Sequence, residues 1–193
     1  MGEDANEEDV ALMTLVACGD ESAFARLVEK HQQAVLGTIA KMTNQSPDTE
    51  DIAQQVFIRL WKSAKRYQPT AKFTTFLFTI TRNLVFNASR QKTRRKEHSL
   101  EQQEDESQRT AEDQSIGARP DDNLAQQELR EIVDRAIASL PEKQRLAVIL
   151  RRYEQMPYEE IASVLELSVS AVKSQLFRAR TALRESLEPY LND

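Results

Sequence analysis

Five side chains near the end of the sequence carry groups that can read DNA without covalent chemistry. They lie off the apolar stripe of a predicted helix: Ser170, Lys173, Ser174, Phe177 and Arg178. Arginine bonds guanine edges, serine bonds base edges or phosphate, and phenylalanine contacts a thymine methyl group. Residues 171–184 contain four cations and no acid. The pattern favours a helix lying in a major groove, and the alternative is a solvated basic helix with Phe177 in the core.

A helix–turn–helix is the element that must position these side chains. Its first helix is predicted over residues 158–166, and its second begins after the short turn 167–169. Ser168 is a predicted N-cap, because its hydroxyl can accept a hydrogen bond from a free backbone N–H of the second helix. The second helix has a buried stripe at i, i+4, i+7 and i+11: Val172, Leu176, Ala179 and Leu183.

A second stretch, residues 73–96, combines aromatic rings, an amide and cations. Its predicted buried stripe is Phe73, Leu77, Ile80 and Leu84. Phe78, Arg82 and Phe86 lie off that stripe, Asn83 lies at its edge, and six cations without an acid follow between residues 82 and 96. Bases stack on rings while cations follow phosphates, so the stretch fits a single-stranded nucleic-acid surface. An aromatic core helix with a solvated basic end explains the residues equally well.

A predicted helix over residues 49–65 has large apolar groups on two sides. Ile52, Val56 and Leu60 form its buried stripe. Ile58 and Trp61 lie opposite, beside the polar residues Asp51 and Gln54. Two apolar sides indicate a second packing partner, which is either another helix of the same domain or another protein.

The composition narrows the function classes. Only four glycines occur in 193 residues, and Ala, Leu, Glu, Gln and Arg are abundant, which favours an all-α fold. One cysteine excludes an internal disulfide, and no His or Cys stands at metal-ligand spacing. No phosphate-binding glycine loop or nucleophile with a base is present, so neither an enzyme nor a cofactor is expected. The absence of a signal peptide or long apolar run predicts a cytoplasmic protein without membrane insertion.

Charge divides the chain into segments. Residues 1–9 are predicted to be an acidic tail, and residues 10–96 an N-terminal helical domain. Residues 97–122 hold nine acids and two bases with only two large apolar side chains, which predicts a disordered acidic linker. Residues 123–193 form the predicted C-terminal domain with the helix–turn–helix. We therefore expect two small helical domains joined by a flexible linker.

Three sequence blocks together resemble bacterial extracytoplasmic-function (ECF) sigma factors of the sigma-70 family. They are TEDIAQQVFIRLW at 49–61, KFTTFLFTITRN at 72–83, and the block at 139–184 that begins SLPEKQRLAVIL. The resemblance covers nearly the whole chain outside the linker and the acidic tail. It implies a protein that binds core RNA polymerase, recognises promoter DNA at the −10 and −35 elements and assists duplex opening. It also implies an anti-sigma factor as a partner.

The resemblance assigns roles to individual residues. The polymerase-binding face would be Asp51, Gln54, Gln55, Ile58 and Trp61. The single-stranded −10 element would be read by Phe78, Arg82, Asn83, Phe86 and Arg90, with Asn83 holding a base turned out of the stack. The duplex −35 element would be read by Ser170, Lys173, Ser174, Phe177 and Arg178.

The sequence departs from the family pattern at several positions. Phe76 stands where the family usually has Trp, and Gln55 where it usually has an acid, which removes one charge from the docking face. Ser46 and Thr49 are noted as phosphorylation sites that would restore negative charge there. Glu166 stands where a glycine commonly enters the turn, and a non-glycine residue carries a conformational cost if the backbone there is left-handed. Ser170 likewise stands where glycine is common.

Two other functions fit parts of the sequence. A stand-alone helix–turn–helix regulator would bind duplex DNA by itself, but it has no need of a single-strand surface at 73–96. An adaptor would bind polymerase without choosing promoters, and loss of Arg178 would then leave promoter choice unchanged.

Overall fold

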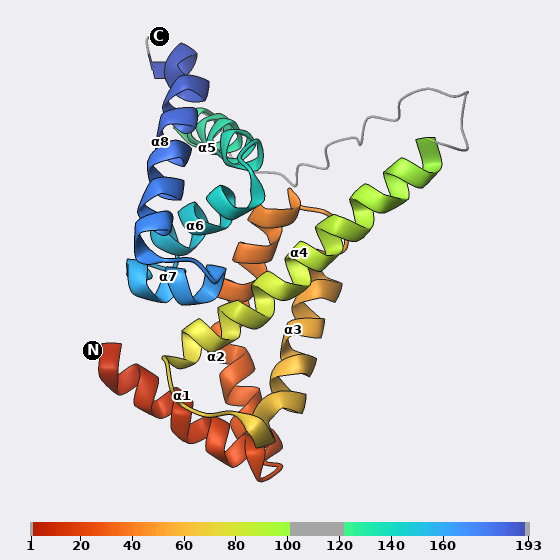
Figure 1. The fold of residues 1–193 in the computed structure, drawn as a ribbon, viewed down its shortest axis with the longest axis vertical. Helices are drawn as coiled ribbons and strands as arrows, with labels where there is room; N and C mark the ends of the chain where they lie inside the picture. Colours follow the sequence, from red (N-terminus) through yellow and green to blue (C-terminus); the bar gives the residue numbers. More distant parts are fainter. Residues whose placement is uncertain (1, 101–121, 192–193) are drawn as a thin grey trace.

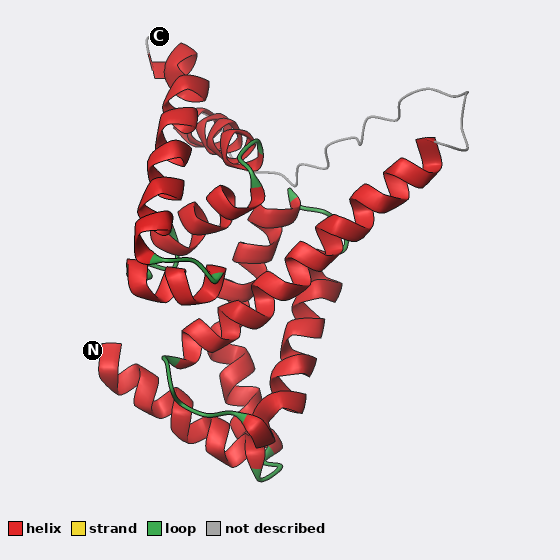
Figure 2. Cartoon of the chain, in the orientation of Figure 1, coloured by secondary structure: helices red, strands yellow, loops and turns green. Residues whose placement is uncertain are grey.

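The computed structural model describes residues 2–100 and 122–191, and all regular elements within these ranges are helices (Figures 1 and 2). The N-terminal elements are α1 (Gly2–Ala17), α2 (Glu21–Thr43), α3 (Thr49–Ser63), the short 3₁₀ helix η1 (Ala64–Arg66) and α4 (Phe73–Leu100). The C-terminal elements are α5 (Asp122–Ala138), α6 (Glu142–Arg152), α7 (Tyr158–Leu165) and α8 (Val169–Leu191). The all-α prediction is confirmed. The predicted linker falls mostly on residues 101–121, which lie outside the described residues, and its first residues instead extend α4 to Leu100.

Local signals in the sequence set the ends of several helices. The Asp20 carboxylate caps α2 by accepting a hydrogen bond from the backbone N–H of Ala23 at 3.0 Å. Helix α2 ends at Thr43, and its C-cap Asn44 adopts the left-handed conformation with φ of 54°. The Ser168 hydroxyl accepts from the backbone N–H of Ala171 at 3.2 Å, as expected for the N-cap of α8.

Residues Gly2–Asp9, predicted to be an acidic tail, form the first half of α1 instead. Asp9 is only 2% exposed and explains the difference. Its carboxylate accepts a hydrogen bond from His31 Nε2 at 3.0 Å and pairs with Lys30 Nζ at 2.6 Å, both on α2. Glu8 adds exposed ion pairs to Arg26 and Lys30. Two of the acidic residues on which the prediction of a tail was based therefore attach this segment to α2.

We expect Asp9→Ala to lower the free energy of unfolding by about 2–3 kcal/mol, because His31 and Lys30 lose their shared buried carboxylate. Burial alone would raise the pKa of Asp9, but its hydrogen bonds with His31 and Lys30 outweigh burial and lower it. Such a carboxylate stabilises the fold above its unfolded pKa, and that contribution is lost as pH falls through the folded value. The difference between wild type and variant in urea unfolding should therefore shrink below about pH 4. Glu8→Ala is the matched exposed control, and equal losses in the two variants would contradict the assignment.

The N-terminal and C-terminal helices pack against each other around one continuous hydrophobic core. Helix α7 packs on α4, while α5 and α6 pack on α2 (Figure 1). Both groups supply fully buried side chains, among them Leu27 and Leu77 from the first and Leu146 and Ile161 from the second. The two predicted domains are therefore joined by direct packing in this structure.

Candidate nucleic-acid interface

Helix α8 presents all five of its predicted DNA-reading side chains to solvent. Four of them line one shallow hollow: Lys173, Ser174, Phe177 and Arg178. Phe177 is 69% exposed, which excludes the alternative that its ring belongs to the core. Ser170 lies one turn earlier, where its backbone carbonyl accepts a hydrogen bond from the Ser174 hydroxyl at 3.0 Å. An exposed ring beside two cations and two hydroxyls suits a major groove.

The opposite side of α8 holds this surface in place. Val172, Leu176 and Ala179 are buried, as the periodicity predicts, and Leu183 is partly buried against the core. The turn before α8 passes through Glu166, whose φ of 53° places it in the left-handed region. The turn thus keeps the backbone geometry that a glycine usually supplies, although the residue is glutamate.

Helix α4 does not bring its five predicted −10-element residues onto one face. Asn83 and Arg90 are exposed and Phe86 is half-buried. Phe78 and Arg82 are only 3% and 7% exposed, and Val85, which follows them on the same side, is also buried. The sequence prediction placed Phe78 and Arg82 on an open nucleic-acid surface. In the packed structure both side chains are buried instead, because α7 packs on α4, and their role at the −10 element stays a prediction.

The guanidinium of Arg82 has two partners from different parts of the chain. Its Nη2 donates to Asn83 Oδ1 at 2.6 Å and to Glu166 Oε1 at 2.7 Å, and its Nε donates to Asn83 Oδ1 at 3.1 Å. The hydrogen bond from Arg82 lowers the pKa of the Glu166 carboxyl below its ordinary value. Two predicted −10-element residues are thus bound to each other and to the turn of the helix–turn–helix.

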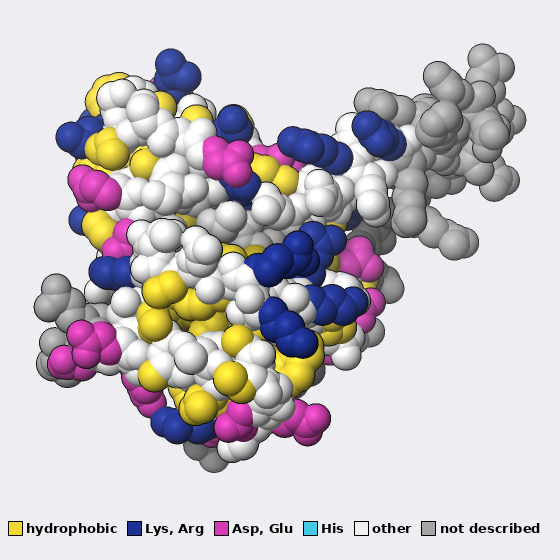
Figure 3. Space-filling model, turned by 60° about the horizontal axis from the view of Figure 1, so that its bottom comes forward, with side chains coloured by type: hydrophobic (Ala, Val, Ile, Leu, Met, Phe, Trp, Pro, Cys, Tyr) yellow, Lys and Arg dark blue, Asp and Glu magenta, His cyan; other side chains and the backbone are white. Residues whose placement is uncertain are grey.

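The far part of α4 projects from the packed body (Figure 1), and Lys and Arg side chains gather on one side of the face drawn in Figure 3. Arg90, Lys92 and Arg94 are exposed there. Cations on a projecting helix can follow a phosphate backbone. This part of the predicted single-strand surface is open in the structure.

Helix α3 has an exposed polar face with one apolar residue. Asp51, Gln54 and Gln55 are exposed, and Ile58 is partly exposed. Trp61 differs, because its ring packs edge-on against Phe24 of α2 with centroids 5.0 Å apart. The sequence left open whether Ile58 and Trp61 pack within this domain or against another protein. Trp61 packs at least partly within the protein, whereas Ile58 remains available to another protein.

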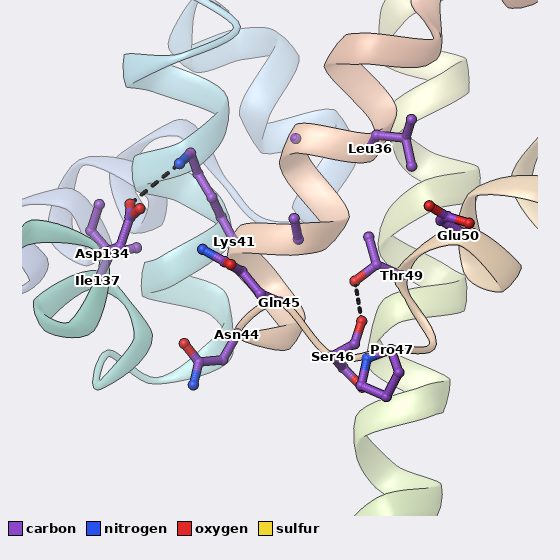
Figure 4. Close-up of a pocket in the computed structure, with 12 residues that line it drawn as sticks. Leu36, Lys41, Asn44, Gln45, Ser46, Pro47, Thr49, Glu50, Asp134 and Ile137 are labelled. Atoms are coloured by element: carbon purple, nitrogen blue, oxygen red, sulfur yellow. Dashed lines mark hydrogen bonds and ion pairs between the residues drawn. The ribbon is translucent and has the colours of Figure 1, made fainter. Parts of the chain in front are cut away.

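Polar contacts also cross between the two groups of helices. Lys72 Nζ lies 2.7 Å from Glu160 Oε1 of α7, and Lys41 Nζ of α2 lies 3.3 Å from Asp134 Oδ1 of α5. Figure 4 shows the Lys41–Asp134 pair at the edge of a hollow between the α2–α3 turn and α5. Arg145 Nη1 donates to the backbone carbonyl of Met42 at 2.8 Å.

These cross-contacts could not be predicted from the sequence pattern. Lys72, Glu160 and Arg145 look like ordinary surface charges, and their partners lie far away in the sequence. Glu166 is unusual in the sequence, because it stands where glycine is common, but this did not identify Arg82 as its partner. Among the described residues, no group of three or more His, Cys, Asp or Glu side chains could hold a metal ion. None of the described helices combines the length and the apolar character needed to cross a membrane.

Comparisons with known proteins cover both groups of helices. Residues 27–95 match the family model for sigma-70 region 2, and residues 130–183 match the model for sigma-70 region 4. The chain is 32% identical over 191 residues to the RNA polymerase sigma-H factor of Pseudomonas aeruginosa, covering 97% of each protein. It is also 32% identical over 187 residues to the ECF RNA polymerase sigma-E factor of Escherichia coli, covering 95% of this chain and 96% of the relative.

Solved structures show the same architecture. CnrH in complex with the cytosolic domain of CnrY superposes with a TM-score of 0.70 at 25% identity, covering 94% of this chain and 98% of that one. The sigma factor RpoE of Bartonella quintana, solved in complex with the anti-sigma factor NepR, has a TM-score of 0.66 at 21% identity, covering 86% and 96%. The second likeness shows the fold alone.

Proposed function

Since this chain belongs to the sigma-70 family as an ECF sigma factor, we propose that its two groups of helices divide the recognition of polymerase and promoter. As a sigma factor it binds core RNA polymerase, directs the enzyme to promoters through −10 and −35 elements and assists DNA opening. It acts by binding and not by covalent catalysis, and its place of action is the cytoplasm, where polymerase and DNA are. Because relatives of this length are sigma factors, the stand-alone regulator is not retained.

The −35 element is read by α8. The observation that carries this assignment is the exposed cluster of Lys173, Ser174, Phe177 and Arg178 on a helix whose other side is buried. Such a helix can enter a major groove without disturbing its own domain. Ser170, at the N-terminal end of the helix, is placed to contact a base edge or a phosphate.

The −10 element is read by α4, and polymerase is bound by α3. Asn83, Phe86 and Arg90 form the part of the α4 surface that is accessible in the structure, and Phe78 and Arg82 join it when the C-terminal helices move away. Asp51, Gln54, Gln55 and Ile58 form the docking face on α3, with Trp61 at its edge. An anti-sigma factor is the expected regulator. CnrH, a structural neighbour at 25% identity, was likewise solved with a bound protein, the cytosolic domain of CnrY.

The test of this function combines polymerase binding with promoter selection. The purified protein should co-elute with bacterial core RNA polymerase and direct transcription from a library of genomic fragments. Start sites that share two spaced motifs would support the proposal and supply a promoter. Failure to co-elute, together with a shift of duplex DNA by the protein alone, would contradict it.

Asn83→Ala is expected to reduce promoter opening about tenfold, because the flipped −10 base loses the amide that holds it. Opening is measured by permanganate reactivity of unpaired thymines on a promoter recovered from the library. Binding to the −35 duplex should stay unchanged. Equal losses of opening and of −35 binding would argue against a base pocket at Asn83.

A further inference from the structure

Helix α4, to which the −10 element is assigned, begins without a capping side chain at the position before it. That residue is Lys72, whose ammonium group donates hydrogen bonds and cannot accept one from a backbone N–H. The first backbone N–H groups of a helix have no partner within the helix, and a Ser, Thr, Asp or Asn side chain usually accepts from one of them. The start of α4 therefore depends on an acceptor from elsewhere in the chain.

Asn6 of α1 supplies this acceptor from 67 positions earlier in the sequence. Its side-chain Oδ1 accepts a hydrogen bond from the backbone N–H of Phe73, the first residue of α4, at 2.8 Å. Asn6 is half-buried, and Figure 1 shows the N-terminal half of α1 beside the start of α4. One side chain of α1 thus caps a helix that follows much later in the chain.

An asparagine at position 6 is unfavourable for α1 itself. Position 6 lies inside this helix, which runs from Gly2 to Ala17. Asparagine has a lower helix propensity than alanine, because its side chain competes for backbone hydrogen bonds. The contact with Phe73 offsets this local cost, so the residue type at position 6 suits α4 better than it suits α1.

The capped turn anchors α4 in the core. Phe73 is fully buried, and the centroid of its ring lies 5.1 Å from that of His31 and 6.3 Å from that of Tyr67. Phe76, in the same turn of α4, packs on the Tyr67 ring with centroids 5.0 Å apart. These contacts hold the position of α4 along its axis and its rotation about that axis. A frayed first turn would release them.

A second residue of α1 holds the cap in place. Asp9 lies three positions after Asn6 on the same side of α1, and it binds His31 and Lys30 of α2. Asn6 and Asp9 line one hollow together with Phe78, which is assigned to the −10 element. The cap is therefore attached to α2 and adjoins a side chain of the proposed reading surface.

The rotation of α4 decides which side chains face a promoter strand. Asn83 lies about 15 Å along the helix from Phe73, and a displacement of the helix by one residue would turn it through about 100°. Asn83 is exposed and Phe86 is half-buried in the present orientation. A fixed start of α4 presents these side chains in one orientation before DNA binds, which lowers the entropy lost on binding.

We propose that Asn6 is a positioning residue for recognition of the −10 element, because its amide caps α4 and fixes the orientation of the helix that reads the opened strand. This inference rests on the proposed function, since it assumes that α4 reads the −10 element. Asn6 acts through α4 and not by contact with DNA. Loss of the cap lowers the population of the correctly oriented helix and leaves the −35-reading surface of α8 unaffected.

The test compares two caps of the same chemistry on different helices. Asn6→Ala removes the cap of α4, and Asp20→Ala removes the cap of α2, where the Asp20 carboxylate accepts from the backbone N–H of Ala23 at 3.0 Å. Each change should raise the unfolding equilibrium constant in urea about fivefold, since the two caps are of the same kind. Asn6→Asp is the rescue variant, because a carboxylate of the same size also accepts from Phe73 and suits a helix N-terminus.

The first readout is amide hydrogen exchange of the full chain, followed by mass spectrometry of peptides that cover residues 67–80. In Asn6→Ala the first turn of α4 should exchange about fivefold faster than in wild type, because that turn opens locally. Asp20→Ala and Asn6→Asp should keep the wild-type rate in this segment. Unchanged exchange in Asn6→Ala would overturn the capping of α4 by Asn6.

The second readout is promoter opening by the protein bound to core RNA polymerase, measured by permanganate reactivity alongside binding to the −35 duplex. Asn6→Ala should reduce opening about three- to fivefold and leave −35 binding unchanged. Asn6→Asp should restore opening, and Asp20→Ala, although equally destabilised, should open the promoter like wild type. Equal losses of opening in Asn6→Ala and Asp20→Ala would show a contribution to stability alone and overturn the positioning role.

These readouts separate this inference from the proposed function. The exchange experiment needs neither polymerase nor promoter, so it decides whether Asn6 caps α4 even if the chain fails to bind polymerase. Failure of the wild type to bind polymerase would overturn the sigma-factor function and the positioning role together. Faster exchange with wild-type opening in Asn6→Ala would leave the sigma-factor function standing and remove only the positioning role.

Discussion

Replacing Ile58 by aspartate is expected to weaken binding to core RNA polymerase about 30-fold. Ile58 is the apolar residue at the centre of an otherwise polar face of α3, flanked by the exposed Gln54 and Gln55. An apolar anchor in the middle of an interface contributes about 2 kcal/mol when it is truncated, and a buried charge in its place adds a desolvation cost. Fluorescence anisotropy of labelled protein titrated with core enzyme measures the dissociation constant.

Ile58 is a cleaner probe than Trp61, which the sequence also points to. The Trp61 ring packs on Phe24, so its substitution would disturb the contact between α2 and α3 as well as the docking face. Leu129→Asp is the matched control, because Leu129 is an exposed apolar residue on α5, away from the α3 face. An unchanged affinity in Ile58→Asp, or an equal loss in Leu129→Asp, would remove α3 from the interface.

Arg178→Ala is expected to lower affinity for the −35 element about tenfold and to relax base preference at one position. A bidentate arginine–guanine contact contributes about 1–3 kcal/mol of discrimination, whereas a phosphate contact weakens all sequences alike. Competition among −35 duplexes with single base changes, measured in the presence of polymerase, separates the two kinds of contact. A uniform loss across all duplexes would make Arg178 a phosphate ligand.

Arg180 offers a control within the same helix. It has the same side chain, is also exposed, and lies about 200° around the helix from Arg178. Arg180→Ala should therefore leave base preference unchanged. If both variants relax the preference to the same extent, the groove-facing side of α8 is assigned wrongly.

Helix positions and the reading side of α8 could be predicted from local pattern. Val172 and Leu176 recur at helical spacing, and Ser168 stands where a capping hydroxyl is needed, so periodicity and capping give the same answer. Phe177 was predicted from its place off the stripe, and the structure confirms its exposure. These features depend on residues within a few turns of one another.

Features that depend on distant partners could not be predicted. Asp9 was predicted to lie in an acidic tail, because its partners His31 and Lys30 are more than twenty positions away in the sequence and no local pattern points to them. Phe78 and Arg82 lie off the stripe that faces α2 and α3, and periodicity cannot tell a surface open to DNA from one covered by a second group of helices. An apolar stripe shows which side of a helix is buried, but which residues cover the other sides depends on the whole fold.

The left-handed conformation of Glu166 has a consequence for the genetics of this regulator. Either glutamate codon becomes a glycine codon by one nucleotide change, and glycine both suits the backbone and lacks the carboxylate that holds Arg82. A single mutation at codon 166 would therefore ease the turn and remove the carboxylate partner of Arg82 together, without touching a DNA-reading or polymerase-docking residue.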